Sequence, residues 1–120
     1  MGLLDRFRSG AARGGGALRG GVGSGADARY LAEWVHTRIG VEGYIEPKTT
    51  ITDVTVVLIA ADGEWTRRIV GERGARRLAG GLRIPVYDVR KTGYPQRMRD
   101  YDARRRVERQ RAVERDLRDQ

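Results

Sequence analysis

The chain has 120 residues and a formal net charge of +8, and 22 of its 24 basic residues are arginine. It has no cysteine, which excludes disulfides, thiolate nucleophiles and cysteine-based zinc sites. No apolar run approaches the roughly 20 residues of a membrane span, and the first residues lack the apolar stretch of a signal peptide. We therefore expect one small cytoplasmic domain without a transmembrane segment.

The positive charge is concentrated at the two ends of the chain. Residues 1–25 carry four arginines and one acid, and residues 96–120 carry nine arginines and six acids, whereas the middle is nearly balanced. This pattern predicts a flexible basic Gly-rich arm over residues 1–25, a folded α/β core over 26–95 and a charged helical C-terminal extension over 96–120. Basic flanks favour an anionic partner, although GC-rich coding also enriches arginine.

The first arm divides into two parts. Residues 2–8 can form two amphipathic turns with Leu3, Leu4 and Phe7 on one side. Residues 9–25 contain eight glycines and should be a linker, because they have little apolar surface to bury. The short apolar peptide could dock on a protein partner or on the core, or have no specific role.

The core is predicted to begin with a helix over residues 27–39, with Asp27 as its N-cap and Gly40 as its stop. Its apolar stripe follows helical spacing and comprises Leu31, Trp34, Val35 and Ile39. Residues 42–47 then read as a short extended segment. Within it, Tyr44 and Ile45 are candidates for burial.

Two strands are predicted next. Residues 52–60 are rich in valine and apolar on both faces, which is typical of a central strand covered on both sides. Asp62-Gly63 follows at once and predicts a hairpin, because both residues tolerate a positive φ. The second strand should cover residues 64–70.

A short helix is predicted over residues 72–79, with Ala75, Leu78 and Ala79 facing inward and Gly80-Gly81 ending it. The strand expected over residues 82–89 should lie at a sheet edge or begin after Pro85, because proline cannot donate a ladder hydrogen bond. We expect residues 86–89 to lie beside the hairpin in a mixed sheet.

Residues 96–119 predict a long charged helix. Three acid–arginine pairs at i, i+4 spacing should largely neutralise it, at about 0.2–0.5 kcal/mol each: Asp100–Arg104, Asp102–Arg106 and Glu114–Arg118. Its apolar residues are too sparse for a coiled coil. The predicted fold class is therefore α/β, with α+β as the alternative: a small mixed sheet built on a β-hairpin with two packed helices.

No catalytic residue, metal ligand or cofactor is predicted. His36 should be exposed, because it falls off the apolar stripe of its helix. Ser9 and Ser24 both lie in the flexible arm, so a Ser-His-acid triad is not expected, and no ligand cluster suits a metal. Residues 21–26 match G-x-G-x-x-A by letters but lack the preceding strand that a dinucleotide site requires.

The most promising constellation lies at residues 88–99, where the last strand gives way to the long helix. Arginine forks bind phosphate, and tyrosine can stack on a base. The candidate nucleic-acid or anion-binding residues are Arg90, Lys91, Tyr94, Arg97, Arg99, Arg67 and Arg68, and a possible pocket involves Asp62, Trp65 and Asp88. Alternatively, this stretch is a plain connecting loop with Tyr94 packed on the core, and Trp65 belongs to the core as well.

Three segments carry a resemblance to a known family. The run from Val54 to Arg68, the segment Ile84-Pro85-Val86-Tyr87-Asp88-Val89 and the segment from Gly93 to Tyr101 resemble a family of small uncharacterised actinobacterial proteins. The likeness covers residues 27–101, and the start of the chain is similar too. Some relatives carry the label oxidoreductase, but this sequence shows no redox residue and no cofactor motif, so the resemblance implies a lineage and no chemistry.

These observations favour a small basic non-enzymatic module that binds an anionic partner, with RNA or a ribonucleoprotein as the first choice. One alternative is a small-ligand or nucleotide-binding protein with its pocket beyond Asp62 and Asp88. A second is a protein-interaction adaptor that docks through the Leu3/Leu4/Phe7 peptide or through the C-terminal helix.

Overall fold

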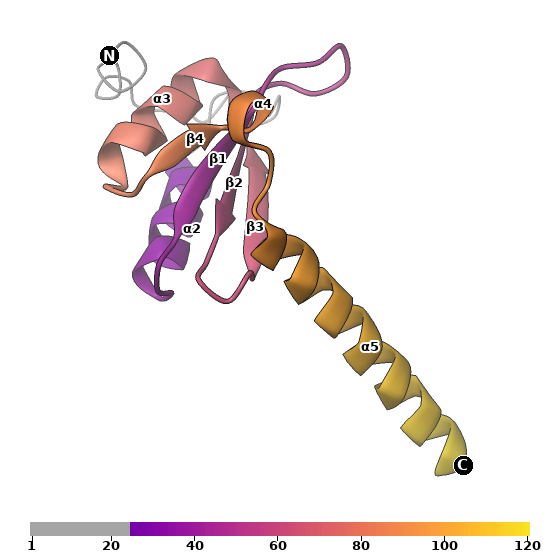
Figure 1. Ribbon diagram of the computed structural model, residues 1–120. Coiled ribbons are helices and arrows are strands. Elements are labelled where there is room, and N and C mark those ends of the chain that lie inside the picture. Colours follow the sequence, from indigo (N-terminus) through magenta and orange to yellow (C-terminus); the bar gives the residue numbers. More distant parts are fainter. Residues whose placement is uncertain (1–24) are drawn as a thin grey trace.

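The computed structural model describes residues 25–120, which form a four-stranded mixed sheet with flanking helices (Figure 1). The elements in chain order are α2 (Gly25–His36), β1 (Glu42–Glu46), β2 (Thr55–Ile59), β3 (Trp65–Ile69), α3 (Gly71–Gly81), β4 (Val86–Asp88), α4 (Val89–Thr92) and α5 (Gln96–Arg118). This α+β fold confirms the predicted mixed sheet and its packed helices. The expectations for residues 1–24, including the Leu3/Leu4/Phe7 peptide, lie outside the described residues. Over residues 25–120, no helix is both long and apolar enough to cross a membrane.

The strand order in the sheet is β3-β2-β1-β4. Strands β1, β2 and β3 form an antiparallel meander, whereas β4 pairs in parallel with β1, so α3 carries the chain from one sheet edge to the other. Strand β4 begins after Pro85 at an edge, as predicted from the missing proline N–H. The expectation that it lies beside the β2–β3 hairpin is wrong, because β1 lies between them.

One face of the sheet carries the main core, and α2 and α3 cover it. Leu31 and Trp34 of α2 and Leu78 of α3 are buried against the apolar side chains that β2 points to this side, Val56 and Leu58. Strand β2 is buried along its whole length, which confirms the prediction of a central strand covered on both faces.

The opposite face carries a smaller core. Tyr44, Val57 and Ile59 are buried there beneath Met98 from the first turn of α5, with Trp65 and Tyr94 half-buried at its margin. Beyond these first turns α5 leaves the sheet and projects into solvent (Figure 1). The predicted long helix is thus confirmed, and its beginning packs on the core.

The β2–β3 connection differs from the predicted two-residue turn. The Ala60 N–H donates to the Glu64 carbonyl at 2.8 Å, and the Gly63 N–H donates to the Ala60 carbonyl at 2.9 Å. The turn therefore consists of three residues, 61–63. Only Gly63 has a positive φ, of 94°, among these three residues. This arrangement is typical of a type I turn followed by a left-handed glycine. A Cβ at Gly63 would lie 2.1 Å from the Arg97 carbonyl oxygen, so the turn is pressed against α5.

Three helix ends also differ from expectation. Helix α2 ends at His36, so Ile39 lies outside it and is 82% exposed, and Asp27 lies inside the first turn instead of capping it. Helix α3 runs through both predicted stop glycines, since Leu82 N–H still bonds the Leu78 carbonyl. The short helix α4 was not predicted, and it begins where the Asp88 carboxylate accepts the Arg90 backbone N–H.

Candidate functional site

The predicted cationic cluster at residues 88–99 does not gather into one site. Asp88 pairs with Ile45 at the carboxyl end of β1, and Arg90 and Lys91 follow it in α4. Arg97 instead binds Glu42 at the opposite end of β1. The connection from α4 to α5 therefore crosses the sheet and separates the cations into two groups.

Arg97 stabilises the fold by bonding α5 to the sheet. Its Nη2 donates to the Glu42 carboxylate at 2.7 Å, and its Nε donates to the Ala60 carbonyl at 2.9 Å. The hydrogen bond from Arg97 lowers the pKa of Glu42, and the Tyr44 hydroxyl contributes a second bond. Burial, together with the bond to Glu42, raises the pKa of Tyr44 to about 12.

Two further members of the cluster are also occupied. The Tyr94 ring is half-buried, with its centroid 6.4 Å from that of Tyr44, so it packs on the core as the alternative interpretation held. Arg99 is exposed and donates twice to the Gln96 side chain within α5. Neither residue joins Arg90 and Lys91.

The hairpin arginines lie on opposite faces of β3. Arg67 donates from Nε and Nη2 to the Glu46 carboxylate at 3.1 and 2.8 Å. Arg68 lies 3.6 Å from the Asp27 carboxylate, with its guanidinium 3.8 Å from the centre of the Tyr30 ring. Both side chains are held by residues of the fold.

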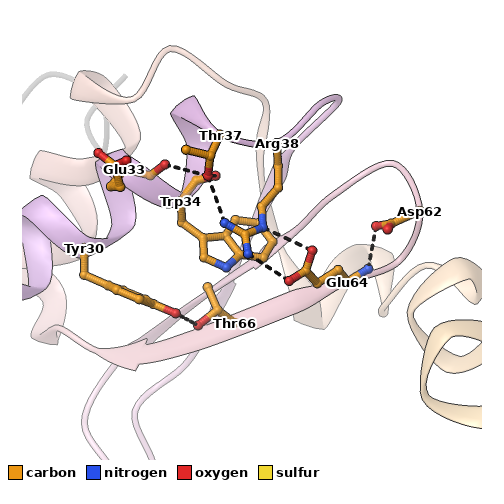
Figure 2. Close-up of polar contacts among 8 residues, drawn as sticks. All are labelled: Tyr30, Glu33, Trp34, Thr37, Arg38, Asp62, Glu64 and Thr66. Carbon is orange, nitrogen blue, oxygen red and sulfur yellow. Dashed lines mark hydrogen bonds and ion pairs between the residues drawn. The ribbon is translucent and has the colours of Figure 1, made fainter. Parts of the chain in front are cut away.

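A polar cluster that the sequence did not predict joins the end of α2 to the start of β3 (Figure 2). Arg38 stacks 4.2 Å above the Trp34 ring and donates to Glu64 through two bonds of 3.1 and 2.9 Å. The bond to Glu64 raises the pKa of Arg38. Nearby, Tyr30 and Thr66 share a hydrogen bond of 2.8 Å. The polar groups of this cluster bond one another, and the cluster attaches α2 to the sheet.

The three residues of the possible pocket do not meet. Asp62 and Trp65 lie at the turn end of the sheet, whereas Asp88 lies at the other end, beside Ile45. The Asp62 carboxylate accepts the Glu64 N–H at 3.0 Å, and Trp65 donates its Nε1–H to Asp102 at 2.8 Å. Trp65 therefore attaches α5 to the sheet. The alternative interpretation that Trp65 belongs to the core holds in part, because the side chain is half-buried against the smaller core.

The projecting part of α5, residues 103–118, is called the α5 arm here. None of the three predicted i, i+4 ion pairs forms in the described chain. Asp100 accepts from Gln96 instead, Asp102 accepts from Trp65, and Arg104 donates to the Asp62 carbonyl. A tertiary contact thus occupies Asp102, and a bond within α5 occupies Asp100. Six exposed arginines of the arm have no ion-pair partner within residues 25–120, namely Arg104, Arg106, Arg109, Arg111, Arg115 and Arg118.

A hollow of about 370 Å³ marks the root of the arm. The Trp65 ring forms one of its walls, and Asp102 holds that ring in place. Arg105, Arg106 and Arg109 border the same hollow. An aromatic ring and three guanidinium groups are therefore brought together from segments that lie about 40 residues apart in the sequence.

A larger cavity, of about 590 Å³, lies at the carboxyl ends of β1 and β4 and is called the β4 cleft. Its rim includes Asp88, Arg90 and Lys91 from the predicted set and Lys48, which the sequence analysis missed. Arg90 donates to both Asp88 carboxylate oxygens, at 3.2 and 2.8 Å. These bonds, and that of the Arg90 backbone N–H, lower the pKa of Asp88 to about 2.

In comparisons with known proteins, no family model, curated protein or solved structure matches the chain. The chemistry of the α5 arm and of the β4 cleft is therefore the basis for assigning a function.

Proposed function

We propose that this protein is a non-enzymatic module that binds RNA, free or within a ribonucleoprotein, through the α5 arm. The observation that carries this proposal is the charge of the arm: seven of its 16 residues are arginine, and six of these lack an ion-pair partner within residues 25–120. The arm also stands clear of the sheet (Figure 1), so a polyanion can approach it from several sides.

The spacing of the arginines suits a phosphate backbone. At about 100° and 1.5 Å per residue, Arg104, Arg111, Arg115 and Arg118 fall within about 60° of one another and span about 21 Å along the helix. We call these four residues the arginine stripe. Each guanidinium fork can engage phosphate oxygens in a bidentate manner, and binding should release counterions without reading sequence.

The hollow at the arm's root adds a second contact surface, on the side of α5 opposite the arginine stripe. Trp65 is half-buried, with Arg106 and Arg109 on the rim around it. An aromatic ring beside guanidinium groups is a suitable platform for an unpaired base, whereas a base inside a duplex is already stacked. This combination favours single-stranded RNA as the ligand.

The proposal is tested by a mobility-shift assay at low salt with a single-stranded RNA of mixed sequence. A stripe variant, R111Q/R115Q/R118Q, should bind much more weakly than the wild type. A control variant, R29Q/R73Q/R83Q, removes the same charge from exposed positions of the core and should bind nearly as tightly. Equal loss in both variants would show that net charge alone drives binding, and no binding by the wild type would refute the proposal. Duplex DNA, run in parallel, should bind less tightly.

A second candidate is a protein-interaction adaptor that uses the same arm. Val107, Val113 and Leu117 are 44%, 57% and 64% exposed, and a partner helix could cover them. Their spread over about 120° of the helix circumference gives a broad, weak apolar face instead of a regular seam. The RNA proposal is therefore preferred.

A further inference from the structure

The β4 cleft lies where α/β proteins commonly bind ligands. Strands β1 and β4 run in parallel and both end at it, and the first turn of α3 and helix α4 close its sides. Such crevices beyond the carboxyl ends of parallel strands are frequent ligand sites. The volume of about 590 Å³ is in the range of small-molecule pockets.

The interior of the cleft is apolar. Ile45 of β1, Val86 of β4, Val54 from the segment before β2 and Ala75 of α3 line it. Ala75 is the small residue on the helical wall, so space remains between helix and sheet. An apolar ring system placed against these walls would lose contact with water on the side that faces them.

The rim of the cleft carries an excess of cations. Its two carboxylates already form ion pairs: Asp88 pairs with Arg90, and Glu72 pairs with Arg76 one helical turn later. Lys48 and Lys91 form no ion pair within residues 25–120. Both ammonium groups border the same cavity and are exposed to solvent, so they are available to a ligand that brings its own negative charge.

We propose that the β4 cleft binds a nucleoside monophosphate, with the base against the aliphatic walls and the phosphate between Lys48 and Lys91. A phosphomonoester carries about −1.5 to −2 charges at neutral pH, which matches two free ammonium groups better than a carboxylate does. A free nucleotide and the 5′-phosphorylated end of an RNA strand present the same chemistry. This inference is independent of the RNA proposal, because the α5 arm starts at the opposite end of β1.

The test is a titration of the ¹⁵N-labelled full chain with each of the four ribonucleoside monophosphates, followed by amide chemical shifts. We expect saturable shifts at Lys48, Ala75 and Lys91. K48Q and K91Q should each weaken binding about tenfold, the effect of losing one charge-assisted bond of about 1.4 kcal/mol. Filling the cleft by Ala75→Leu should abolish binding. Should that variant not fold, the two exposed lysine variants still decide the question.

Three comparisons complete the test. R106Q, on the α5 arm, should leave nucleotide binding unchanged, so failure of the RNA proposal and failure of this one are distinguishable. A 5′-phosphorylated tetranucleotide that binds more tightly than the free nucleotide, and loses that advantage in K91Q, would identify a strand end as the ligand. A free nucleotide that binds more tightly than the tetranucleotide would identify the mononucleotide.

Three results would overturn the inference. One is the absence of saturation by any of the four nucleotides up to about 10 mM, a weaker affinity than a specific pocket should give. Another is binding that K48Q and K91Q leave unchanged. A third is inorganic phosphate binding as tightly as the nucleotides, which would mean that the apolar walls contribute nothing.

Discussion

The Arg97 guanidinium bonds the Glu42 carboxylate at 2.7 Å and the Ala60 carbonyl at 2.9 Å, and so attaches the first turn of α5 to the ends of β1 and β2. The long helix leaves the sheet in a direction that this contact and the Trp65–Asp102 bond set together. The arginine that stood at the centre of the predicted binding cluster is thus the residue that positions the arm, and the cations of the arm remain for a partner.

Arg97→Gln should therefore lower the free energy of unfolding by about 1–2 kcal/mol, because Glu42 loses a charge-assisted partner in a half-buried position. Arg99→Gln is the matched control and should stay within about 0.5 kcal/mol of the wild type, since Arg99 bonds only Gln96 in the described chain. Urea denaturation followed by circular dichroism measures both. Equal effects would contradict the positioning role of Arg97.

Gly63→Ala should destabilise the protein by about 2 kcal/mol or more. The new methyl group would meet the Arg97 carbonyl oxygen at 2.1 Å, and the residue has a φ of 94°. Gly81→Ala is its control: a Cβ there contacts nothing within 4 Å, and alanine should stabilise α3 by about 0.5–1 kcal/mol. Thermal unfolding of the two variants should shift in opposite directions. Similar shifts for both would show that α5 does not press on the turn.

Lowering the pH should destabilise the start of α4, because protonation of Asp88 weakens its bonds to Arg90. Its pKa lies near 2, below the ordinary value of 3.8, because Arg90 bonds the ionised carboxylate. A carboxyl group with a depressed pKa contributes stability that is complete above its unfolded pKa and is lost as the pH falls through its folded pKa. We expect this loss between about pH 4 and pH 2. The carboxyl carbon resonance of Asp88 should titrate with a midpoint near 2 and move toward 4 in Arg90→Gln. An ordinary midpoint in the wild type would contradict the contact.

RNA binding should quench the fluorescence of Trp65. This ring lines the hollow beside Arg106 and Arg109, whereas Trp34 of α2 is buried in the main core and should report little. Titration with single-stranded RNA should lower the emission, and Trp65→Phe should remove most of the change. Quenching that survives in Trp65→Phe would place the RNA elsewhere.

Local pattern predicted much of the fold. The valine-rich strand, the apolar stripe of α2 and the interruption at Pro85 each follow from contacts between near neighbours, and all three appear where expected except for Ile39 of the stripe. The insertion of β1 between the hairpin and β4 did not follow, because strand order depends on pairing between residues some 40 positions apart.

The candidate site was harder to predict for the same reason. Spacing along α5 suggested that Asp102 would neutralise Arg106, but Asp102 accepts a bond from Trp65 across the fold instead. Arg97 is bonded to Glu42, which lies 55 positions away in the sequence, so local spacing does not reveal that this cation is occupied. The arginine stripe has cations spaced by 7, 4 and 3 residues along one helix, but the sequence analysis did not predict it, because it assigned two of these arginines to ion pairs.

The salt dependence of RNA binding tests the central claim most directly. Fluorescence anisotropy with a labelled single-stranded RNA, between about 50 and 300 mM salt, gives the slope of log affinity against log salt. The stripe variant R111Q/R115Q/R118Q removes three phosphate contacts, so its slope should be shallower than that of the wild type by about 2, at about 0.7 per contact. The core variant R29Q/R73Q/R83Q should keep the wild-type slope. Identical slopes for the wild type and the stripe variant would contradict the assignment of the α5 arm as the RNA-binding surface.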